Sequence, residues 1–440
     1  MPRLFGTDGI RGRAMEPPLD EATVRRIGAA LAAWLGGGSP RVLLAGDTRA
    51  STTVLAGWMA ESLAAAGCRV VWGGILPTPA VSTLLREDGF GAGVVISASH
   101  NPAHDNGIKV LGPGGEKLSE DAEEAIEALM ETASPGAGPD LPEPDRTLAD
   151  RYLDHLAGTF DGERPLEGLD LVVDAAHGAA SRLAGPLFER LGASVTVVAC
   201  DPDGANINDG CGATEPGTVA REVIRRGADA GLALDGDADR AILVGADGTI
   251  LDGDGILLAW GRDLAARDRL PGRTVVATVM SNLGLERALA DDGVRLVRSA
   301  VGDRNVWLAM RRHGAALGGE QSGHVICAHH AVTGDGLLTG AHVLALVRRS
   351  GMTLTEVLDF PRVPQVLVNV PVRRKPPFEE VPEIARWVQA VTERLAGSGR
   401  LLLRYSGTEA KARIMIEGDD EQLIHALAGE GFTLLTHHLT

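Results

Sequence analysis

Residues 231–240 read GLALDGDADR, an apolar stretch that runs directly into an acidic loop. The same succession occurs at residues 93–102, which read GVVISASHNP, and at residues 315–324, which read AALGGEQSGH. Short apolar runs bounded by glycine and polar residues predict buried β-strands. Each of these strands is the third of a set, which predicts the following strands: Val42–Ala45, Arg69–Trp72 and Gly93–Ile96; Leu171–Val173, Ser194–Ala199 and Gly231–Leu234; Thr274–Thr278, Arg295–Arg298 and Ala315–Leu317.

Helical periodicity separates these strands, as at Leu55, Met59 and Leu63. Strands that alternate with helices indicate α/β domains, in which α/β/α layers surround parallel or mixed sheets. Ligands of such sheets bind beyond the carboxyl ends of the strands. Three polar loops at equivalent strand ends therefore predict one cleft built by three related domains.

Proline- and glycine-rich segments place the domain boundaries. We expect three related domains at residues 1–145, 146–250 and 251–363, followed by a smaller α+β domain at residues 364–440. The last domain is predicted to contain strands near Gln365–Val370, Leu401–Leu403 and Ala412–Glu417, a helix around Glu380–Leu395 and a terminal helix from about Asp420.

The composition excludes several classes of protein. The 440 residues carry a formal net charge of −17, which disfavours binding to nucleic acid. An anionic substrate would need arginine and lysine gathered locally. The four cysteines form no CxxC pair, the first residues do not resemble a signal peptide, and no apolar run could span a membrane. We therefore expect a cytoplasmic protein with no membrane association.

The acidic loop predicts a metal site. Asp235, Asp237 and Asp239 can converge on one ion if the loop curls, and hard oxygen ligands select Mg²⁺ or Ca²⁺. An EF-hand is excluded because its required glycine and glutamate positions hold Arg240 and Ala246. A plain solvated acidic turn is the alternative, but three close carboxylates repel one another without a cation.

The loop after residue 96 offers a nucleophile. Ser99 lies in a loop whose backbone N–H groups can face an anion, with His100 and Lys109 nearby in the sequence. Ser97 is the competing nucleophile, and a serine that caps a turn or helix is the structural alternative. The absence of a Gly-x-Ser-x-Gly elbow argues against an α/β-hydrolase.

Two further loops suit a phosphorylated sugar. The carboxylate and hydroxyl of Glu320 and Ser322 can bind sugar hydroxyls, although a polar surface turn is equally compatible with this segment. RYSGTE at residues 404–409, with Arg413 beyond it, combines arginine, hydroxyls and glycine as a phosphate cradle would. The glycine-rich start, GTDGIRG at residues 6–12, brings Arg11 and could fold over the same cleft.

These motifs, in this order, resemble those of the α-D-phosphohexomutases over essentially the whole chain. They are GTDGIRG (6–12), SASHNP (97–102), DGDADR (235–240), GGEQSGH (318–324) and RYSGTE (404–409). The resemblance implies four domains around a central cleft and an intramolecular phosphotransferase. The first motif, the fourth motif and the NIN…CGAT stretch (206–214) most resemble members that act on glucosamine phosphate.

The resemblance also assigns roles to the matching residues. Ser99 would carry a phosphoryl group, and one Mg²⁺ per chain would bind the three aspartates and a phosphoserine oxygen. Catalysis would involve Ser99, His100, Lys109, Arg240 and Arg11. Substrate binding would involve Glu320, Ser322, Arg404, Ser406, Gly407, Thr408 and Arg413.

The implied reaction interconverts glucosamine-6-phosphate and glucosamine-1-phosphate through a sugar bisphosphate, which also activates the enzyme, and it feeds UDP-N-acetylglucosamine synthesis. Mannose or glucose phosphate is the alternative substrate. A hydrolase with an aspartate nucleophile and a sugar-phosphate sensor without turnover are less compatible with the full set of motifs. The sequence leaves the general base open between His100 and Lys109, and allows a monomer or a homodimer. Ala238 and Ala410 depart from the family pattern without removing a predicted ligand.

Overall fold

The computed structural model describes residues 4–160, 164–406 and 410–440. The chain divides into two compact units. One comprises Met1–Thr278 and Leu296–Asp359, and the other comprises Val279–Arg295 and Phe360–Thr440. Among the described residues, no helix combines the length and apolar character needed to cross a membrane.

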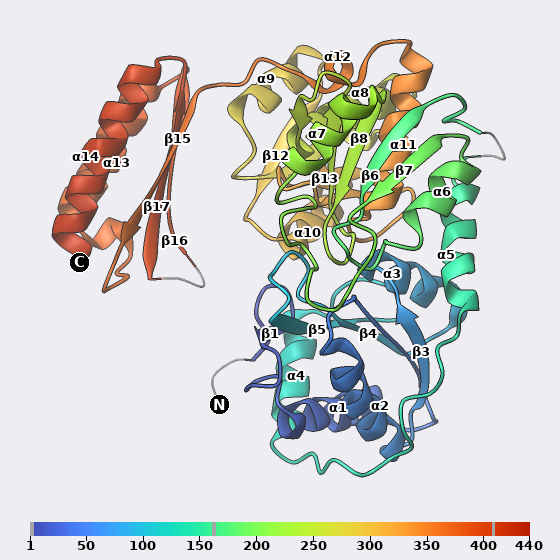
Figure 1. Cartoon of the computed structure of the whole chain (residues 1–440). Helices are drawn as coiled ribbons and strands as arrows, with labels where there is room; N and C mark the ends of the chain where they lie inside the picture. Colours follow the sequence, from blue (N-terminus) through green and yellow to red (C-terminus); the bar gives the residue numbers. More distant parts are fainter. Residues whose placement is uncertain (1–3, 161–163, 407–409) are drawn as a thin grey trace. The chain divides into compact units, whose positions relative to one another are not determined.

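The first domain is built on a five-stranded mixed sheet (Figure 1). Its strand order is β1 (Ile10–Arg13), β5 (Asp105–Leu111), β4 (Ala92–Ile96), β2 (Arg41–Gly46) and β3 (Arg69–Ile75). β2 is parallel to β3 and β4, whereas β5 is antiparallel to β4. Its helices are α1 (Glu21–Leu35), α2 (Thr52–Ala65), α3 (Thr78–Asp88) and α4 (Glu120–Met130).

Helices cover both faces of this sheet. Leu31, Met59 and Ile126, from α1, α2 and α4, are fully buried in one core with strand residues of the sheet. On β4, Gly93 brings the backbone against α3, because a Cβ there would lie 2.8 Å from the side chain of Val81. The α/β/α layering predicted from the sequence is therefore confirmed for this domain.

The second domain repeats this arrangement. Its strand order is β10 (Ile250–Leu251), β9 (Ala241–Gly245), β8 (Ala230–Leu234), β6 (Asp170–Asp174) and β7 (Ser194–Val198). β6 is parallel to β7 and β8, and β9 is antiparallel to β8. The helices of this part of the chain are α5 (Thr147–Gly158), α6 (Ala184–Arg190) and α7 (Gly217–Arg226).

The third sheet has four strands, in the order β12 (Arg295–Ser299), β11 (Thr274–Thr278), β13 (Leu317–Gly319) and β14 (Val325–Cys327). β13 runs parallel to β11 and antiparallel to β14. The helices of this part of the chain are α8 (Gly253–Ala266), α9 (Leu283–Asp291), α10 (Asp303–His313), α11 (Gly336–Ser350) and α12 (Leu354–Leu358), of which α9 belongs to the second compact unit. A 3-10 turn at Pro271–Arg273 precedes β11.

All three sheets share one topology. In each, the second, first, third and fourth strands of the repeat lie in that order, and the fourth strand is antiparallel to the third. The loop between the third and fourth strands carries the polar motif in every case. The sequence predicted three strands per repeat and missed the fourth, because β5, β9 and β14 follow the functional loops without a helix between them.

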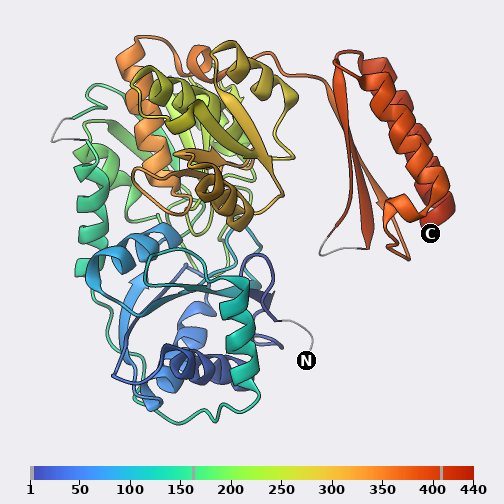
Figure 2. The same cartoon turned by 180° about the vertical axis from the view of Figure 1, so that it is seen from behind.

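The last domain is a three-stranded antiparallel sheet with helices on one face, as Figures 1 and 2 both show. The strands, in spatial order, are β15 (Gln365–Pro371), β17 (Lys411–Gly418) and β16 (Gly399–Tyr405), and the helices are α13 (Pro382–Leu395) and α14 (Glu421–Leu439). A 3-10 turn at Phe378–Glu380 precedes α13. The predicted smaller α+β domain is confirmed.

One predicted strand was misplaced. Ala315–Leu317 was predicted as the strand before the third loop, but β13 spans Leu317–Gly319. The two glycines were read as part of the loop, whereas they pair with β11 and β14. They are required there because a Cβ on Gly318 would lie 2.7 Å from the sulfur of Met310, and a Cβ on Gly319 would lie 2.7 Å from the carbonyl oxygen of His324.

Candidate active site

The loops that follow β4, β8 and β13 meet within the first unit. The Ser99 hydroxyl of the first loop donates a hydrogen bond to Asp235 Oδ2 of the second at 2.5 Å. The Ala241 N–H donates to the Gly323 carbonyl of the third loop at 3.0 Å. Together with the N-terminal segment, these loops enclose a cavity of about 210 Å³, lined by Thr7, Asp8, Arg11, His100, Asp239, Arg240, Val301, Gly302, Asp303, Glu320 and His324.

Ser99 is buried and lies in the left-handed region of backbone conformation, with φ of 52°. Its hydroxyl lies 3.2 Å from His100 Nδ1 as well as against Asp235. Its carbonyl accepts from Asn208 Nδ2 at 2.9 Å. A non-glycine residue with positive φ is held only when its surroundings determine it, so the fold fixes this serine hydroxyl against the aspartates.

Ser97, the competing nucleophile, stabilises the loop that carries Ser99. Its hydroxyl donates to the buried Asp47 at 2.6 Å and accepts the N–H of Ser99 at 2.9 Å. Asp47 also pairs with Arg49, whose guanidinium donates to the Asn101 carbonyl at 2.5 Å. The geometry therefore favours Ser99 as the reactive hydroxyl, while Ser97 holds the loop that carries it.

The three aspartates of the second loop form one acidic cluster. All three are buried, and one carboxylate oxygen from each lies within 4.8 Å of the others. Among the described residues, Asp237 Oδ1 and Asp239 Oδ1 are buried without a hydrogen-bond partner. Buried orphan carboxylate oxygens are costly, and hard cations prefer such ligands. The donor set therefore fits a divalent metal ion.

Burial and the neighbouring charges shift the pKa values of the aspartates in this cluster. Burial, followed by repulsion from Asp239 and Asp237, raises the pKa of Asp235 to about 8. Burial alone would also raise the pKa of Asp239, but attraction from Lys109 and then from His324 outweighs it and holds that pKa well below its ordinary value. A proton on Asp235 therefore relieves repulsion that a bound cation would relieve instead.

Cationic side chains surround these aspartates. Lys109 Nζ, which is buried, lies 2.7 Å from Asp237 Oδ2 and 3.6 Å from Asp239 Oδ2. Arg240 Nε lies 3.9 Å from Asp235 Oδ2. The structure thus places Lys109 and Arg240, both selected from the sequence, at the acidic cluster. Thr78, which the sequence did not single out, donates to Asp237 Oδ2 at 2.5 Å.

The charges of the site leave room for one divalent ion. The pocket and the groups paired with it hold six carboxylates (Asp8, Asp235, Asp237, Asp239, Asp303 and Glu320) and four cations (Arg11, Lys109, Lys117 and Arg240). When all of them are ionised, two negative charges are in excess. One divalent cation would neutralise that excess before any phosphate arrives.

His100 and Lys109, the two candidate bases, differ in charge state. Burial, followed by repulsion from Arg240 and Arg11, lowers the pKa of His100 to about 4. Burial opposes the charge of Lys109, but attraction from Asp237 and Asp239 outweighs it and raises its pKa. Near neutral pH His100 is therefore uncharged and able to accept a proton, whereas Lys109 is an ammonium.

The third loop supplies polar groups to the wall of the cavity. Glu320 Oε1 accepts the N–H of Gly302 at 2.9 Å, and its other oxygen lies 3.5 Å from the Ser322 hydroxyl. Ser322 is exposed and does not itself line the cavity. Of these two predicted sugar ligands, Glu320 therefore belongs to the pocket wall and Ser322 lies beside it.

His324, which the sequence analysis did not assign to the site, lines the cavity. Its Nε2 accepts the N–H of Gly334 at 2.9 Å, and its Nδ1 lies 3.5 Å from Asp239 Oδ2. Because Nε2 is an acceptor, the proton lies on Nδ1 and faces Asp239. The signal that could have found it is its place at the end of the GGEQSGH loop.

The predicted phosphate loop belongs to the second unit. Arg404 of β16 and Arg413 of β17 are directly paired across the antiparallel ladder. Burial, followed by repulsion from Arg413, lowers the pKa of Arg404. Like charges that face each other across a ladder are destabilising, and an anion between them removes the repulsion. Ser406 is buried nearby, whereas Gly407 and Thr408 lie outside the described residues.

The comparisons with known proteins agree with this fold. Four models of the phosphoglucomutase/phosphomannomutase family match in chain order. The α/β/α domains I, II and III match residues 2–136, 150–248 and 252–363, and the C-terminal domain matches residues 367–432.

Among relatives, the phosphoglucosamine mutase of Anaeromyxobacter sp. (strain Fw109-5) is 46% identical, covering 97% of this chain and 94% of its own. That of Rhodospirillum rubrum is also 46% identical, covering 97% of both chains. Among solved structures, a phosphoglucomutase/phosphomannomutase family protein from Burkholderia thailandensis has a TM-score of 0.81 and 25% identity, covering 99% of this chain and 97% of its own.

Three related α/β/α domains, with a buried serine against an aspartate triad and a smaller fourth domain, define a phosphohexomutase fold. The chain belongs to the phosphoglucomutase/phosphomannomutase family, and it is an intramolecular phosphotransferase.

Proposed function

We propose that this chain interconverts glucosamine-6-phosphate and glucosamine-1-phosphate through a phosphoserine at Ser99, and so feeds UDP-N-acetylglucosamine synthesis. The observation that carries the proposal is the buried Ser99 hydroxyl, 2.5 Å from one carboxylate of the aspartate triad. The choice of glucosamine is supported by relatives named phosphoglucosamine mutase, which are 44–46% identical over 97% of this chain.

A single Mg²⁺ fits the acidic cluster. Asp235, Asp237 and Asp239 would hold it, together with an oxygen of the phosphate on Ser99. Bound there, the ion would withdraw charge from the phosphoryl group. Arg11 and Arg240 would balance the remaining charge, because the serine phosphate adds roughly two negative charges.

The chemistry is an exchange of phosphate esters. An oxygen of the sugar attacks the phosphorus on Ser99, the bond from phosphorus to the serine oxygen breaks, and a sugar bisphosphate forms. His100, uncharged and 3.2 Å from the serine oxygen, takes the proton of the attacking hydroxyl. His100 then passes this proton to the departing serine oxygen, which becomes a hydroxyl again. In the second half, the serine oxygen attacks the other phosphate of the bisphosphate while His100 takes its proton, and His100 delivers that proton to the departing sugar oxygen.

The substrate needs two sets of contacts. Glu320 and Ser322 would bind the sugar hydroxyls, and Lys109 would balance the charge of the aspartates beside the phosphate. Arg404, Ser406 and Arg413, with Gly407 and Thr408, would bind the phosphate that is not reacting. Because the sugar bisphosphate must turn around between the two half-reactions, these contacts must bind its non-reacting phosphate in either orientation of the sugar. Added bisphosphate would also activate enzyme that has lost its phosphate.

The location and assembly stay predictions. We propose a cytoplasmic enzyme, consistent with four cysteines that form no disulfide. A monomer or a homodimer is compatible with the proposed reaction, and light scattering on the purified protein distinguishes them.

The decisive experiment measures turnover and covalent phosphate together. The enzyme is incubated with Mg²⁺, a hexose bisphosphate and, in separate samples, the 6-phosphates of glucosamine, mannose and glucose. We expect the highest kcat/KM with glucosamine-6-phosphate, and phosphate on the Ser99 peptide by mass spectrometry. A preference for mannose or glucose phosphate would overturn the choice of substrate.

Two variants test the serine itself. We expect Ser99→Ala to lower kcat by at least about 10³-fold, because the phosphoryl acceptor is lost. Ser97→Ala removes one support of the loop and should cost only about tenfold. Turnover by Ser99→Ala near the wild-type rate would instead indicate a hydrolase-like aspartate nucleophile, and binding without turnover in the wild type would indicate a sensor.

A further inference from the structure

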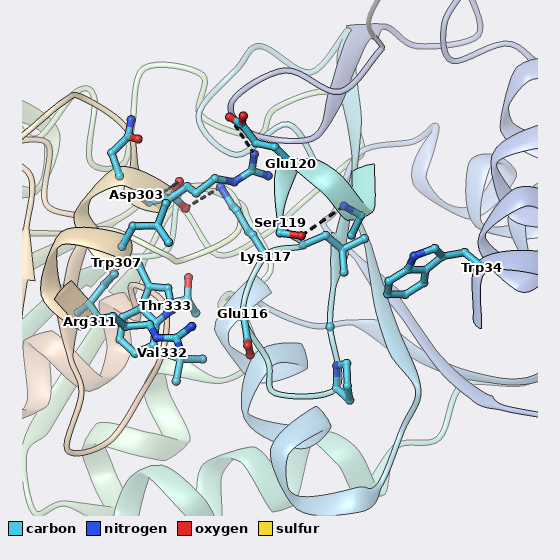
Figure 3. Close-up of a pocket in the computed structure, with 18 residues that line it drawn as sticks. Trp34, Glu116, Lys117, Ser119, Glu120, Asp303, Trp307, Arg311, Val332 and Thr333 are labelled. Atoms are coloured by element: carbon cyan, nitrogen blue, oxygen red, sulfur yellow. Dashed lines mark hydrogen bonds and ion pairs between the residues drawn. The ribbon is translucent and has the colours of Figure 1, made fainter. Parts of the chain in front are cut away.

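Lys117 is a partly buried cation that the proposed reaction does not use. It lies on the turn between β5 and α4, and its side chain is 13% exposed. Its Nζ lies 2.6 Å from Asp303 Oδ2 and also contacts Asp8 Oδ1. Figure 3 shows Lys117 directed at Asp303, beside a cavity of about 390 Å³ that shares Asp303 with the catalytic pocket. Lys117 therefore contacts the catalytic pocket through these two carboxylates.

The first carboxylate belongs to the N-terminal loop. Asp8 Oδ1 contacts Lys117, while its Oδ2 contacts the Arg11 guanidinium and lies 3.5 Å from Lys109 Nζ. The same guanidinium donates to Asn101 Oδ1 in the loop of the reactive serine at 3.2 Å. The position of Arg11 in the pocket thus depends on Asp8, and the other carboxylate oxygen of Asp8 contacts Lys117.

The second carboxylate belongs to the domain that carries the sugar loop. Asp303 is the first residue of α10, and its Oδ1 accepts the N–H of Arg304 at 2.7 Å. The preceding residue, Gly302, donates its N–H to Glu320 Oε1 at 2.9 Å. The orientation of Glu320 therefore depends on the start of α10, which Lys117 ties to the first domain.

We propose that Lys117 is a positioning residue for phosphoryl transfer, which ties the loop of Arg11 to the turn that orients Glu320. The inference rests on the proposed function, because it assigns Arg11 to the phosphate and Glu320 to the sugar. Without Lys117, two carboxylates from different domains would lose the cation that contacts both of them, and they would repel each other. A displacement of about 1 Å at a reacting centre can cost about 100-fold in rate.

The test compares three variants with the wild type, using the hexose phosphate that the wild type converts fastest. We expect Lys117→Met to lower kcat/KM by about 100-fold, with kcat falling through Arg11 and KM rising through Glu320. Lys117→Arg keeps a cation between the carboxylates and should recover most of the loss. Arg151→Met is the matched control, because it removes an ion pair with Asp88. Neither of these residues belongs to the loop of Arg11 or to the turn that orients Glu320. This control variant should stay within about twofold of the wild type.

A double-mutant cycle separates positioning from general stability. In an Arg11→Ala background, adding Lys117→Met should lower kcat by a further factor of about three at most. Lys117 is proposed to affect kcat through Arg11, which is already absent in this background. If Lys117→Met fails to fold, Asp303→Asn takes its place. That variant leaves the Asp8 contact intact, and should therefore raise KM with little change in kcat.

Results that contradict the role of Lys117 can be distinguished from results that contradict the proposed function. Wild-type turnover together with Lys117→Met kinetics within about twofold of the wild type would overturn the positioning role alone, as would full additivity in the cycle or an Asp303→Asn variant with unchanged KM. Absence of turnover by the wild type with every hexose phosphate would overturn the proposed function, and this inference with it.

Discussion

The backbone holds the Ser99 hydroxyl against Asp235, in a conformation with positive φ. Its loop is fixed by side chains that were not evident from the motif, notably Asp47 and Arg49, which are both fully buried. The same holds for the aspartates, whose properties come from mutual repulsion and burial. Reactivity at this scale is therefore a property of the surroundings that the fold supplies.

The raised pKa of Asp235 leads to a prediction on metal binding. With a pKa of about 8, set by burial and by repulsion from Asp239 and Asp237, Asp235 must lose a proton before it binds a cation. We expect the affinity for Mg²⁺ to rise by about tenfold per pH unit up to about pH 8, and then to level off. Calorimetric titration with MgCl₂ at several pH values measures this.

The direction in which stability changes with pH follows from the linkage between proton binding and folding. A carboxyl group with a raised folded pKa takes up protons on folding, so the metal-free protein loses stability as pH rises from the ordinary value towards 8. Mg²⁺ should therefore stabilise the protein more at pH 8 than at pH 6. In Asp235→Asn the pH dependence of binding should largely disappear. An affinity that stays flat between pH 6 and 8 in the wild type would contradict the role of this proton.

At the scale of elements, the active site depends on loops that approach closely. Gly178, in the loop after β6, packs against the backbone of Gly236 in the metal loop. A Cβ on Gly178 would lie 2.7 Å from the Gly236 Cα and 2.8 Å from its carbonyl carbon. Such contacts do not occur with ordinary side chains, so the metal loop would have to move.

We predict that Gly178→Ala lowers kcat by roughly 10- to 100-fold, because it displaces Asp235 and Asp237 from the serine. Gly57→Ala is the matched control. Gly57 lies within α2, and a Cβ there meets nothing within 4 Å. That variant should keep its activity and gain up to about 1 kcal/mol of stability from helix propensity. Equal kinetics for the two variants would show that the packing of these loops does not position the metal site.

At the scale of the whole molecule, we expect acid stability to depend on stacked rings that do not line the catalytic pocket. His342 of α11 stacks with Phe160, at a centroid distance of 4.3 Å, and with His330, at 4.5 Å. Its Nε2 lies 3.0 Å from the Thr159 hydroxyl. Burial, followed by repulsion from His330, lowers the pKa of His342 to about 3. Burial likewise lowers the pKa of His330 to about 4.

These histidines bind protons more readily when the chain is unfolded. Their contribution to stability is complete above about pH 6.5 and is lost as pH falls through the folded values. For His342 the loss amounts to roughly 3 to 5 kcal/mol. We predict that the free energy of unfolding of His342→Phe falls less than that of the wild type between pH 6.5 and 4.5, as measured by urea denaturation. Parallel decreases in both proteins would contradict this.

Much of the fold could be predicted from the sequence. Strand and helix patterns are local, so the repeated strand sets and the smaller last domain were evident from periodicity. The fourth strands were missed because antiparallel pairing after a loop leaves no helical signal. The boundaries of β13 shifted for a related reason, since Gly318 and Gly319 are part of the strand only because they pair with neighbours distant in the chain.

The candidate site divides in the same way. The sequence alone determined the chemistry available: Ser99, the aspartate triad and the arginines stand in motifs whose residue types suit metal and phosphate. Only the tertiary structure decided which groups share a pocket, and it added Thr78, Lys117 and His324. Charge state, burial and the distance between side chains arise from packing between segments far apart in the chain. No local pattern encodes those quantities, because each depends on what the opposite segment places there.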